Sequence, residues 1–144
     1  MNSIIHFTVP GQPQGKARAR TGYNPKVKRV TSHTPENTVL YENLIKTCYL
    51  QNTIGMFNDD ESLELRINAF FEPAKSTSKK KKDQMLEGII HPTKKPDIDN
   101  IAKAVLDALN GIAYHDDRQV IRLAVAKCYS QQARLEIEVR KIEK

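Results

Sequence analysis

The stretch that decides the fold reads PDIDNIAKAVLDALNGIAYHDDRQV, at positions 96–120. Its apolar residues recur at helical spacing up to an Asn-Gly pair, which is typical of a helix C-terminus. Asp97 or Asp99 lies where this helix begins. We therefore expect a helix over about 98–109 that turns four apolar residues towards the core: Ile98, Ile101, Val105 and Leu109.

The segments outside this helix alternate apolar and polar residues, and a period of two predicts half-buried strands. A short polar segment at 130–132 separates the last two strands, so we expect them to pair as a closing antiparallel hairpin. The expected strands are 4–9, 63–71, 121–125 and 135–139, with a further short strand at 27–30 between turns at 24–25 and at Ser32.

Two further helices have recognisable starts. Thr34-Pro35-Glu36 combines an N-cap residue, a proline at the first helical position and an acid, which predicts a helix over about 35–53. Ser78 predicts the start of a short helix that ends near Glu87. Together these elements predict an α+β fold in a single domain over residues 1–144. We expect a mostly antiparallel sheet with two main helices packed on it.

The excess positive charge is confined to the start of the chain. The protein has 23 Lys and Arg against 17 Asp and Glu, a formal net charge of +6. Six positive residues precede the first acid, Glu36, and the remaining 17 equal the 17 acids. This distribution predicts a polyanionic partner held by the N-terminal stretch. The six are Lys16, Arg18, Arg20, Lys26, Lys28 and Arg29.

Composition and spacing exclude several classes of protein and of site. No apolar run approaches the roughly 20 residues of a membrane span, and the N-terminus lacks the pattern of a signal peptide, so we expect a cytoplasmic protein. Cys48 and Cys128 are isolated, which indicates buried, inert thiols. Residues 11–17 are one position too short for a phosphate-binding loop, and residues 97–102 lack the glycine of a calcium loop.

Acidic residues at both ends of the 98–109 helix point to chemistry. Asp97 and Asp99 could converge if the first is extended and the second caps the helix, and a tight turn could return Asp116 or Asp117 to the same end. Clustered carboxylates repel one another unless a cation compensates them. Magnesium or manganese is the natural cation for an all-oxygen site, and two such ions can promote phosphodiester hydrolysis.

Lys103 and Asp107 follow Asp99 at intervals of four residues, on the same helical face. Lys103 could orient the attacking water or neutralise charge on the phosphate, with Asp107 holding it in place. Each residue also has an ordinary structural interpretation, because an Asp at a helix start is commonly a cap and a Lys–Asp pair four apart is commonly solvated. Spacing alone leaves both interpretations open.

The same residues resemble a known family. The stretch at 96–111, followed by YHDDRQV at 114–120, is similar to the two-part carboxylate motif of the RusA family of Holliday junction resolvases. PQGKAR at 13–18 is similar to the family's early basic loop. SKKK at 78–81 and HPTKK at 91–95 resemble its middle segment. The resemblance covers nearly the whole chain, and the departures lie in the loops.

This resemblance implies a magnesium-dependent crossover junction endonuclease, in which Mn²⁺ can substitute and no small-molecule cofactor is needed. It implies a homodimer that cuts four-way junction DNA in recombination and repair, in a family common in prophages. The family's three metal-binding, catalytic aspartates fall on Asp97, Asp99 and Asp117, and its catalytic lysine falls on Lys103. Of the adjacent acids Asp116 and Asp117, the second is taken as the ligand.

Basic residues complete the expected DNA-binding surface. A junction is recognised by its shape, so phosphate contacts that read no bases suffice. Lys94 and Lys95 are expected to hold the strand near the scissile phosphate, whereas the lysines at 79–82 are expected to form a solvated helix face. The remaining phosphate-binding candidates are Lys16, Arg18 and Arg20.

Two alternatives stay open from the sequence. The first is a non-catalytic nucleic-acid-binding module, such as an RNA-binding or ribosome-associated protein, in which the basic segment binds and the aspartates are caps. The second is a metal nuclease that cuts flaps or single strands. Incubation with a four-way junction, duplex and flap controls, with and without Mg²⁺, separates the three.

Overall fold

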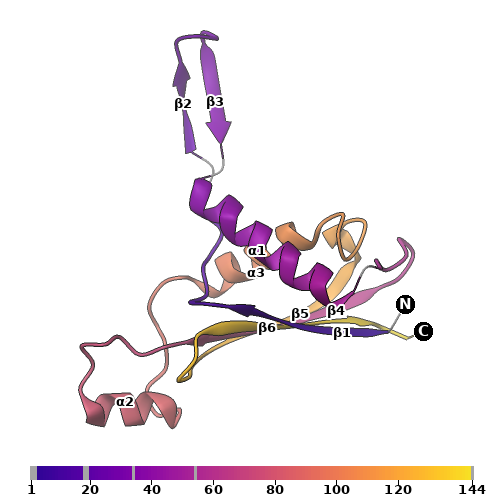
Figure 1. Ribbon diagram of the computed structural model, residues 1–144. Coiled ribbons are helices and arrows are strands. Elements are labelled where there is room, and N and C mark those ends of the chain that lie inside the picture. Colours follow the sequence, from indigo (N-terminus) through magenta and orange to yellow (C-terminus); the bar gives the residue numbers. More distant parts are fainter. Residues whose placement is uncertain (1–2, 18–19, 34, 54, 144) are drawn as a thin grey trace.

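One four-stranded sheet organises the chain (Figure 1). The computed structural model describes residues 3–17, 20–33, 35–53 and 55–143, except for the side chains of residues 20 and 31–33. The strand order is β1-β6-β4-β5, in which β1 pairs with β6 and β6 with β4 antiparallel, whereas β4 and β5 are parallel. The strands are β1 (Ile4–Pro10), β4 (Leu63–Phe71), β5 (Val120–Tyr129) and β6 (Arg134–Lys141).

The expected closing hairpin is wrong, because β4 lies between β5 and β6 and pairs with both. The inward side chains of β4 explain its central place, since all four are fully buried: Leu63, Leu65, Ile67 and Ala69. In contrast, Ile121 and Leu123 of β5 are 60% and 48% exposed. The α+β class is therefore confirmed, but the sheet is mixed, with β5 at its edge.

Two helices, α1 (Glu36–Asn52) and α3 (Ile98–Leu109), pack on one face of the sheet and on each other (Figure 1). Their buried faces join the inward side chains of the strands in one core. The α3 bounds and its end before Asn110 agree with the sequence, except that Ile98, in the first turn, is 45% exposed. Pro35 directly precedes α1 instead of being its first residue, and the expected cap Thr34 lies outside the described residues.

A third helix, α2 (Lys79–Leu86), lies at one end of the molecule and has no buried residue (Figure 1). Its expected cap is confirmed, because the Ser78 hydroxyl accepts a hydrogen bond from the backbone N–H of Lys81 at 3.4 Å. The lysines at 79–82 are exposed, as expected of a solvated face. Nowhere in the described part of the chain is there a helix long and apolar enough to cross a membrane.

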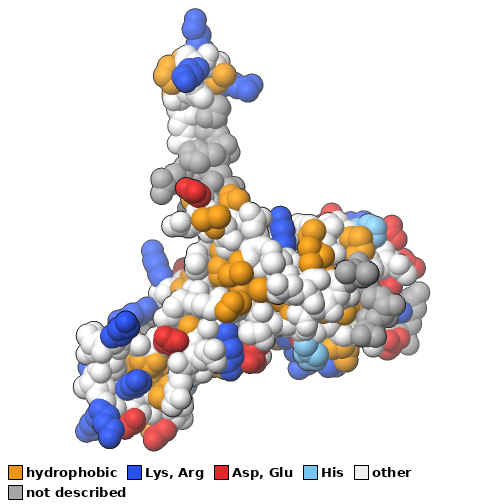
Figure 2. All heavy atoms as spheres, in the orientation of Figure 1, with side chains coloured by type: hydrophobic (Ala, Val, Ile, Leu, Met, Phe, Trp, Pro, Cys, Tyr) orange, Lys and Arg blue, Asp and Glu red, His pale blue; other side chains and the backbone are white. Residues whose placement is uncertain are grey.

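A separate antiparallel hairpin, β2 (Arg20–Asn24) and β3 (Arg29–His33), projects away from the body (Figure 1). The expected strand at 27–30 is wrong in its position, because residues 25–28 form the turn and Ser32 lies within β3. The Asn24 side chain accepts a hydrogen bond from the backbone N–H of Lys26 at 2.9 Å, which starts the turn at Asn24. Figure 2 shows Lys and Arg side chains at the hairpin tip.

Candidate active site

Asp97 and Asp99 stand at the start of α3, and both are exposed. Asp97 has the extended backbone considered from the sequence (ψ 152°), but it is Asp97, and not Asp99, that occupies the N-cap position, and its side chain makes no capping hydrogen bond. Asp99 lies within the first turn of the helix. The Asp97 carboxylate is therefore not used as a cap, which removes the ordinary structural explanation for this residue. Two carboxylates face solvent where the helix begins.

A lysine of the edge strand supports the segment that leads into Asp97. The Lys127 ammonium donates hydrogen bonds to the backbone carbonyls of Lys94 at 2.7 Å and Pro96 at 2.9 Å. Sequence reasoning missed this contact, although a lysine at the end of an apolar strand was a visible signal. Lys94 and Lys95 themselves are exposed, and their contact with DNA stays a prediction.

The loop that follows β1 packs closely against the start of α3. A Cβ atom at Gly15 would lie 2.9 Å from the Asn100 Cβ and 3.0 Å from the Pro96 Cβ, so only glycine fits without a shift. The next residue, Lys16, donates its backbone N–H to the Asn100 carbonyl at 2.8 Å. The Ala17 N–H then reaches the buried hydroxyl of Thr38 on α1 at 3.1 Å. We call residues 15–17 the strap, because they join α3 to α1.

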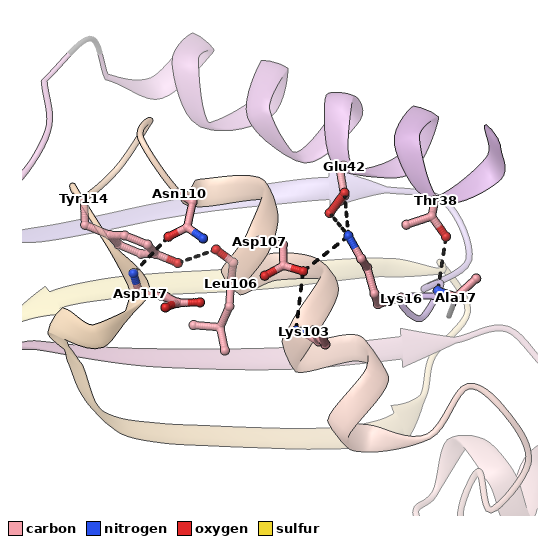
Figure 3. A network of polar contacts seen from close by, with 10 residues as sticks. All are labelled: Lys16, Ala17, Thr38, Glu42, Lys103, Leu106, Asp107, Asn110, Tyr114 and Asp117. Atoms are coloured by element: carbon pink, nitrogen blue, oxygen red, sulfur yellow. Dashed lines mark hydrogen bonds and ion pairs between the residues drawn. The ribbon is translucent and has the colours of Figure 1, made fainter. Parts of the chain in front are cut away.

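The side chain of Lys16 points inward, not towards solvent where the sequence placed it as a phosphate-binding residue (Figure 3). Its ammonium lies 3.1 Å from both carboxylate oxygens of Glu42 and 3.3 Å from Asp107 Oδ2, and the side chain is only 19% exposed. Burial lowers the pKa of Lys16, but the hydrogen bonds and charges of Glu42 and Asp107 outweigh it and raise the pKa above its usual value. Lys16 is therefore held as a cation.

Lys103 contacts the same carboxylate from the outer side. Its ammonium lies 3.7 Å from Asp107 Oδ2, so the expected pair at a spacing of four residues is present. The Lys103 side chain is 64% exposed, in contrast to Lys16. Such an exposed contact is weak, so Asp107 does not fix Lys103 firmly in place.

The acids after α3 lie at its other end. The Asp117 N–H donates to the Asn110 side-chain oxygen at 2.9 Å, and the Tyr114 hydroxyl donates to the Leu106 carbonyl at 2.8 Å (Figure 3). Burial, a hydrogen bond with Asp116 and the charges of nearby carboxylates raise the pKa of Asp117. The hydrogen bond to Asn110 places Asp117 beside the C-terminal end of α3, whereas Asp97 lies at the N-terminal end.

The expected return of Asp117 to the start of α3 is not seen. The 12 residues of this helix span about 18 Å. The segment after it does not extend back along the helix, because Asn110 bridges to Tyr114 and accepts the Asp117 N–H, which keeps Asp117 at the C-terminal end of α3. In the described part of the chain, no group of three or more His, Cys, Asp or Glu side chains is arranged to hold a metal ion. The structure places Asp97 and Asp99 at the start of α3 and brings Lys103 into contact with Asp107, with Asp117 apart at the other end of the helix.

Gln119 holds the turn that carries Asp117, and sequence reasoning missed it. The side chain is buried, and its amide nitrogen donates to the carbonyls of Asn58 at 2.8 Å and Glu61 at 3.1 Å. Its amide oxygen accepts the backbone N–H groups of His115 and Asp116 at 2.9 and 3.2 Å. A fully satisfied buried amide fixes this turn against the body of the protein.

The residues at the start of α3 fit a hard divalent cation. Magnesium keeps several waters and is commonly bound through one or two carboxylates together with substrate phosphates. Asp97 and Asp99 supply two solvent-facing carboxylates of this kind, supported by Lys127 and the strap. Asp117 does not join them within one chain.

Two comparisons with known proteins bear on these residues. Residues 10–140 match the family described as Endodeoxyribonuclease RusA, which confirms the resemblance seen in the sequence. The uncharacterized protein YqaN of Bacillus subtilis (strain 168) is 35% identical over 139 residues, which cover 96% of each chain. The family match includes Asp97, Asp99, Lys103 and Asp117.

Proposed function

The chain belongs to the RusA endodeoxyribonuclease family, and on that premise we propose that it is a Mg²⁺-dependent nuclease that resolves four-way DNA junctions. It would act in the cytoplasm, in recombination and repair, by hydrolysing one phosphodiester in each of two opposed strands. A homodimer suits this reaction, because a two-fold assembly presents two identical sites to a substrate of approximate two-fold symmetry.

One observation carries the proposal. The carboxylates of Asp97 and Asp99 face solvent, that of Asp97 makes no capping hydrogen bond, and Lys103 follows one turn further along α3. The two carboxylates would hold Mg²⁺, or Mn²⁺ in its place, and the bound ion would supply an activated water and neutralise phosphate charge. Lys103, released from Asp107, would place its ammonium against the scissile phosphate. Asp117 is proposed as the third acid of the reaction on the strength of the family motif.

The DNA-binding surface is proposed to run from the α3 start to the projecting hairpin. Lys94 and Lys95 precede Asp97 and are exposed, so they suit the strand that is cut. Arg18 lies outside the described residues, and Arg20 begins β2. Because Lys16 is held by Glu42 and Asp107, the phosphate contacts are proposed for Arg18, Arg20 and the hairpin residues Lys26, Lys28 and Arg29 instead.

Replacement of Asp97 by Asn tests the nuclease. Changes outside the direct ligands of a metal already cost about 10- to 100-fold, so loss of a ligand is expected to lower Mg²⁺-dependent junction cleavage at least about 100-fold. Junction affinity in EDTA should stay within about twofold, because no phosphate-binding cation is removed. Single-turnover cleavage of a labelled synthetic four-way junction and gel-shift titration measure the two effects.

The matched control is Asp83→Asn, an exposed acid on α2 that should leave both measurements unchanged. Full cleavage by Asp97→Asn would refute the proposed metal site. A wild-type protein that binds junctions but cuts none in Mg²⁺ or Mn²⁺ would support the binding-module alternative. Faster cutting of flaps or single strands than of four-way junctions would support the other nuclease class.

A further inference from the structure

We propose that Lys16 is a positioning residue, which keeps Lys103 free for the reaction by occupying Asp107. This inference rests on the proposed nuclease function. It also replaces the role that the sequence suggested for Lys16, direct binding to DNA phosphate. Lys16, the first residue of the basic N-terminal stretch, thus belongs to the ion pairs behind the active site.

The geometry places two ammonium groups on one carboxylate oxygen. Asp107 Oδ2 lies 3.3 Å from the Lys16 ammonium and 3.7 Å from that of Lys103 (Figure 3). Glu42 contacts Lys16 through both of its oxygens at 3.1 Å. The four side chains carry two positive and two negative charges, so the cluster is neutral only while both lysines are present.

The two lysines differ in how firmly they are fixed. Lys16 is held at its backbone by the Asn100 carbonyl and at its side chain by two carboxylates. Lys103 has a largely exposed side chain and contacts Asp107 alone among the described residues. Only Lys103 can therefore leave without breaking the packing between α1 and α3.

Loss of the Lys16 charge would leave Lys103 as the lysine that is held at Asp107. Glu42 and Asp107 would then form an uncompensated pair of partly buried carboxylates, with Lys103 the nearest flexible cation on the same face of α3. Attraction between buried opposite charges is stronger than between exposed ones. Lys103 would be drawn onto Asp107 and away from the phosphate.

The experiment compares Lys16→Met, Lys16→Arg, Asp107→Asn and the double variant Lys16→Met/Asp107→Asn. We expect Lys16→Met to slow single-turnover junction cleavage about tenfold or more, since complete loss of one preorganised donor to the reacting group costs about 10²- to 10³-fold and a misplaced Lys103 would lose part of that. Lys16→Arg should retain most activity. Asp107→Asn should restore much of the rate in the Lys16→Met background, because it releases Lys103. Lys75→Met, an exposed lysine elsewhere, controls for net charge.

Two further measurements separate positioning from the other roles of Lys16. If Lys16 bound a phosphate, Lys16→Met would weaken junction affinity in EDTA and reduce the salt slope by about 1. The proposal expects unchanged affinity and slope. If Lys16 were only structural, Asp107→Asn would add to the loss in activity and in melting temperature instead of reversing it. Either result overturns the proposal.

Acetylation of Lys103, followed by peptide mass spectrometry, gives a readout that needs no cleavage. A lysine paired with a carboxylate reacts more slowly, so we expect Lys103 labelling to fall severalfold in Lys16→Met and to recover in the double variant. Equal labelling in all variants would refute the pairing even if cleavage changed. A wild type that cuts no DNA would refute the proposed function, whereas the labelling still decides the inference.

Discussion

Gly15 shows how one residue constrains the start of α3. Its backbone lies so close to Pro96 and Asn100 that a Cβ atom would stand at 3.0 and 2.9 Å from their Cβ atoms. Forcing a methyl group into a packed contact typically costs about 1–3 kcal/mol. We expect Gly15→Ala to lower the unfolding free energy by about this amount, measured by urea denaturation, and to slow junction cleavage by shifting the helix start.

Gly22→Ala is the matched control, because a Cβ at Gly22 meets no atom within 4 Å. This substitution in the hairpin should leave the unfolding free energy nearly unchanged. Equal stability of the two variants would show that the strap yields easily and does not position α3.

At the scale of residues, the sequence located the carboxylates but not what holds them. Asp97, Asp99 and Lys103 could be chosen because helical spacing and a two-part motif are local properties. Lys127 and Gln119 act through backbone carbonyls that are distant in sequence, by 31 and 33 positions for Lys127 and by 58 and 61 positions for Gln119. No local pattern reports such contacts.

At the scale of elements, the hairpin of β2 and β3 is the part of the proposed DNA-binding surface that substitutions can test most directly. Its tip holds Lys26, Lys28 and Arg29, and no acid lies within it. Removing one phosphate-binding cation reduces the slope of log affinity against log salt by about 0.9. We expect replacement of all three by Gln to weaken junction binding at low salt and to reduce the slope by about 2–3, as measured by fluorescence anisotropy.

The lysine run of α2 provides an equal change of charge for comparison. Replacement of Lys79, Lys80 and Lys81 by Gln removes the same three charges from an exposed face. This variant should bind junctions nearly as the wild type does. Equal losses in the two triple variants would show that net charge, and not the hairpin, governs affinity.

The elements themselves were predicted more accurately than their arrangement. The bounds of α3 and β4 follow from periodicity, because each has one strongly buried face. The order of strands does not, since alternation indicates which side of a strand is buried but not which strand lies next to it. The place of β4 between β5 and β6, and the hairpin of β2 and β3, therefore came only from the structure.

At the scale of the whole molecule, β5 offers a surface for the proposed homodimer. Its outer edge pairs with no strand in the described part of the chain, and unpaired edges are templates for another strand. Leu123 lies opposite the fully buried Leu65 of β4, yet it is 48% exposed. The apolar face of the sheet thus extends beyond the part that the helices cover. Ile121, two residues before Leu123 on the same strand, is exposed as well.

We therefore expect Leu123→Asp to convert a dimer of two 16.4 kDa chains into monomers in sedimentation equilibrium. Burying an unpaired carboxylate costs several kcal/mol, which corresponds to at least about a 100-fold weaker dimer. Ile89→Asp, at a residue 62% exposed near α2, should keep the dimer mass. A Leu123→Asp variant that stays dimeric would exclude this edge as the interface. A monomeric wild type that cuts both opposed strands at full rate would refute the dimer mechanism itself, because each chain would then suffice for paired cleavage.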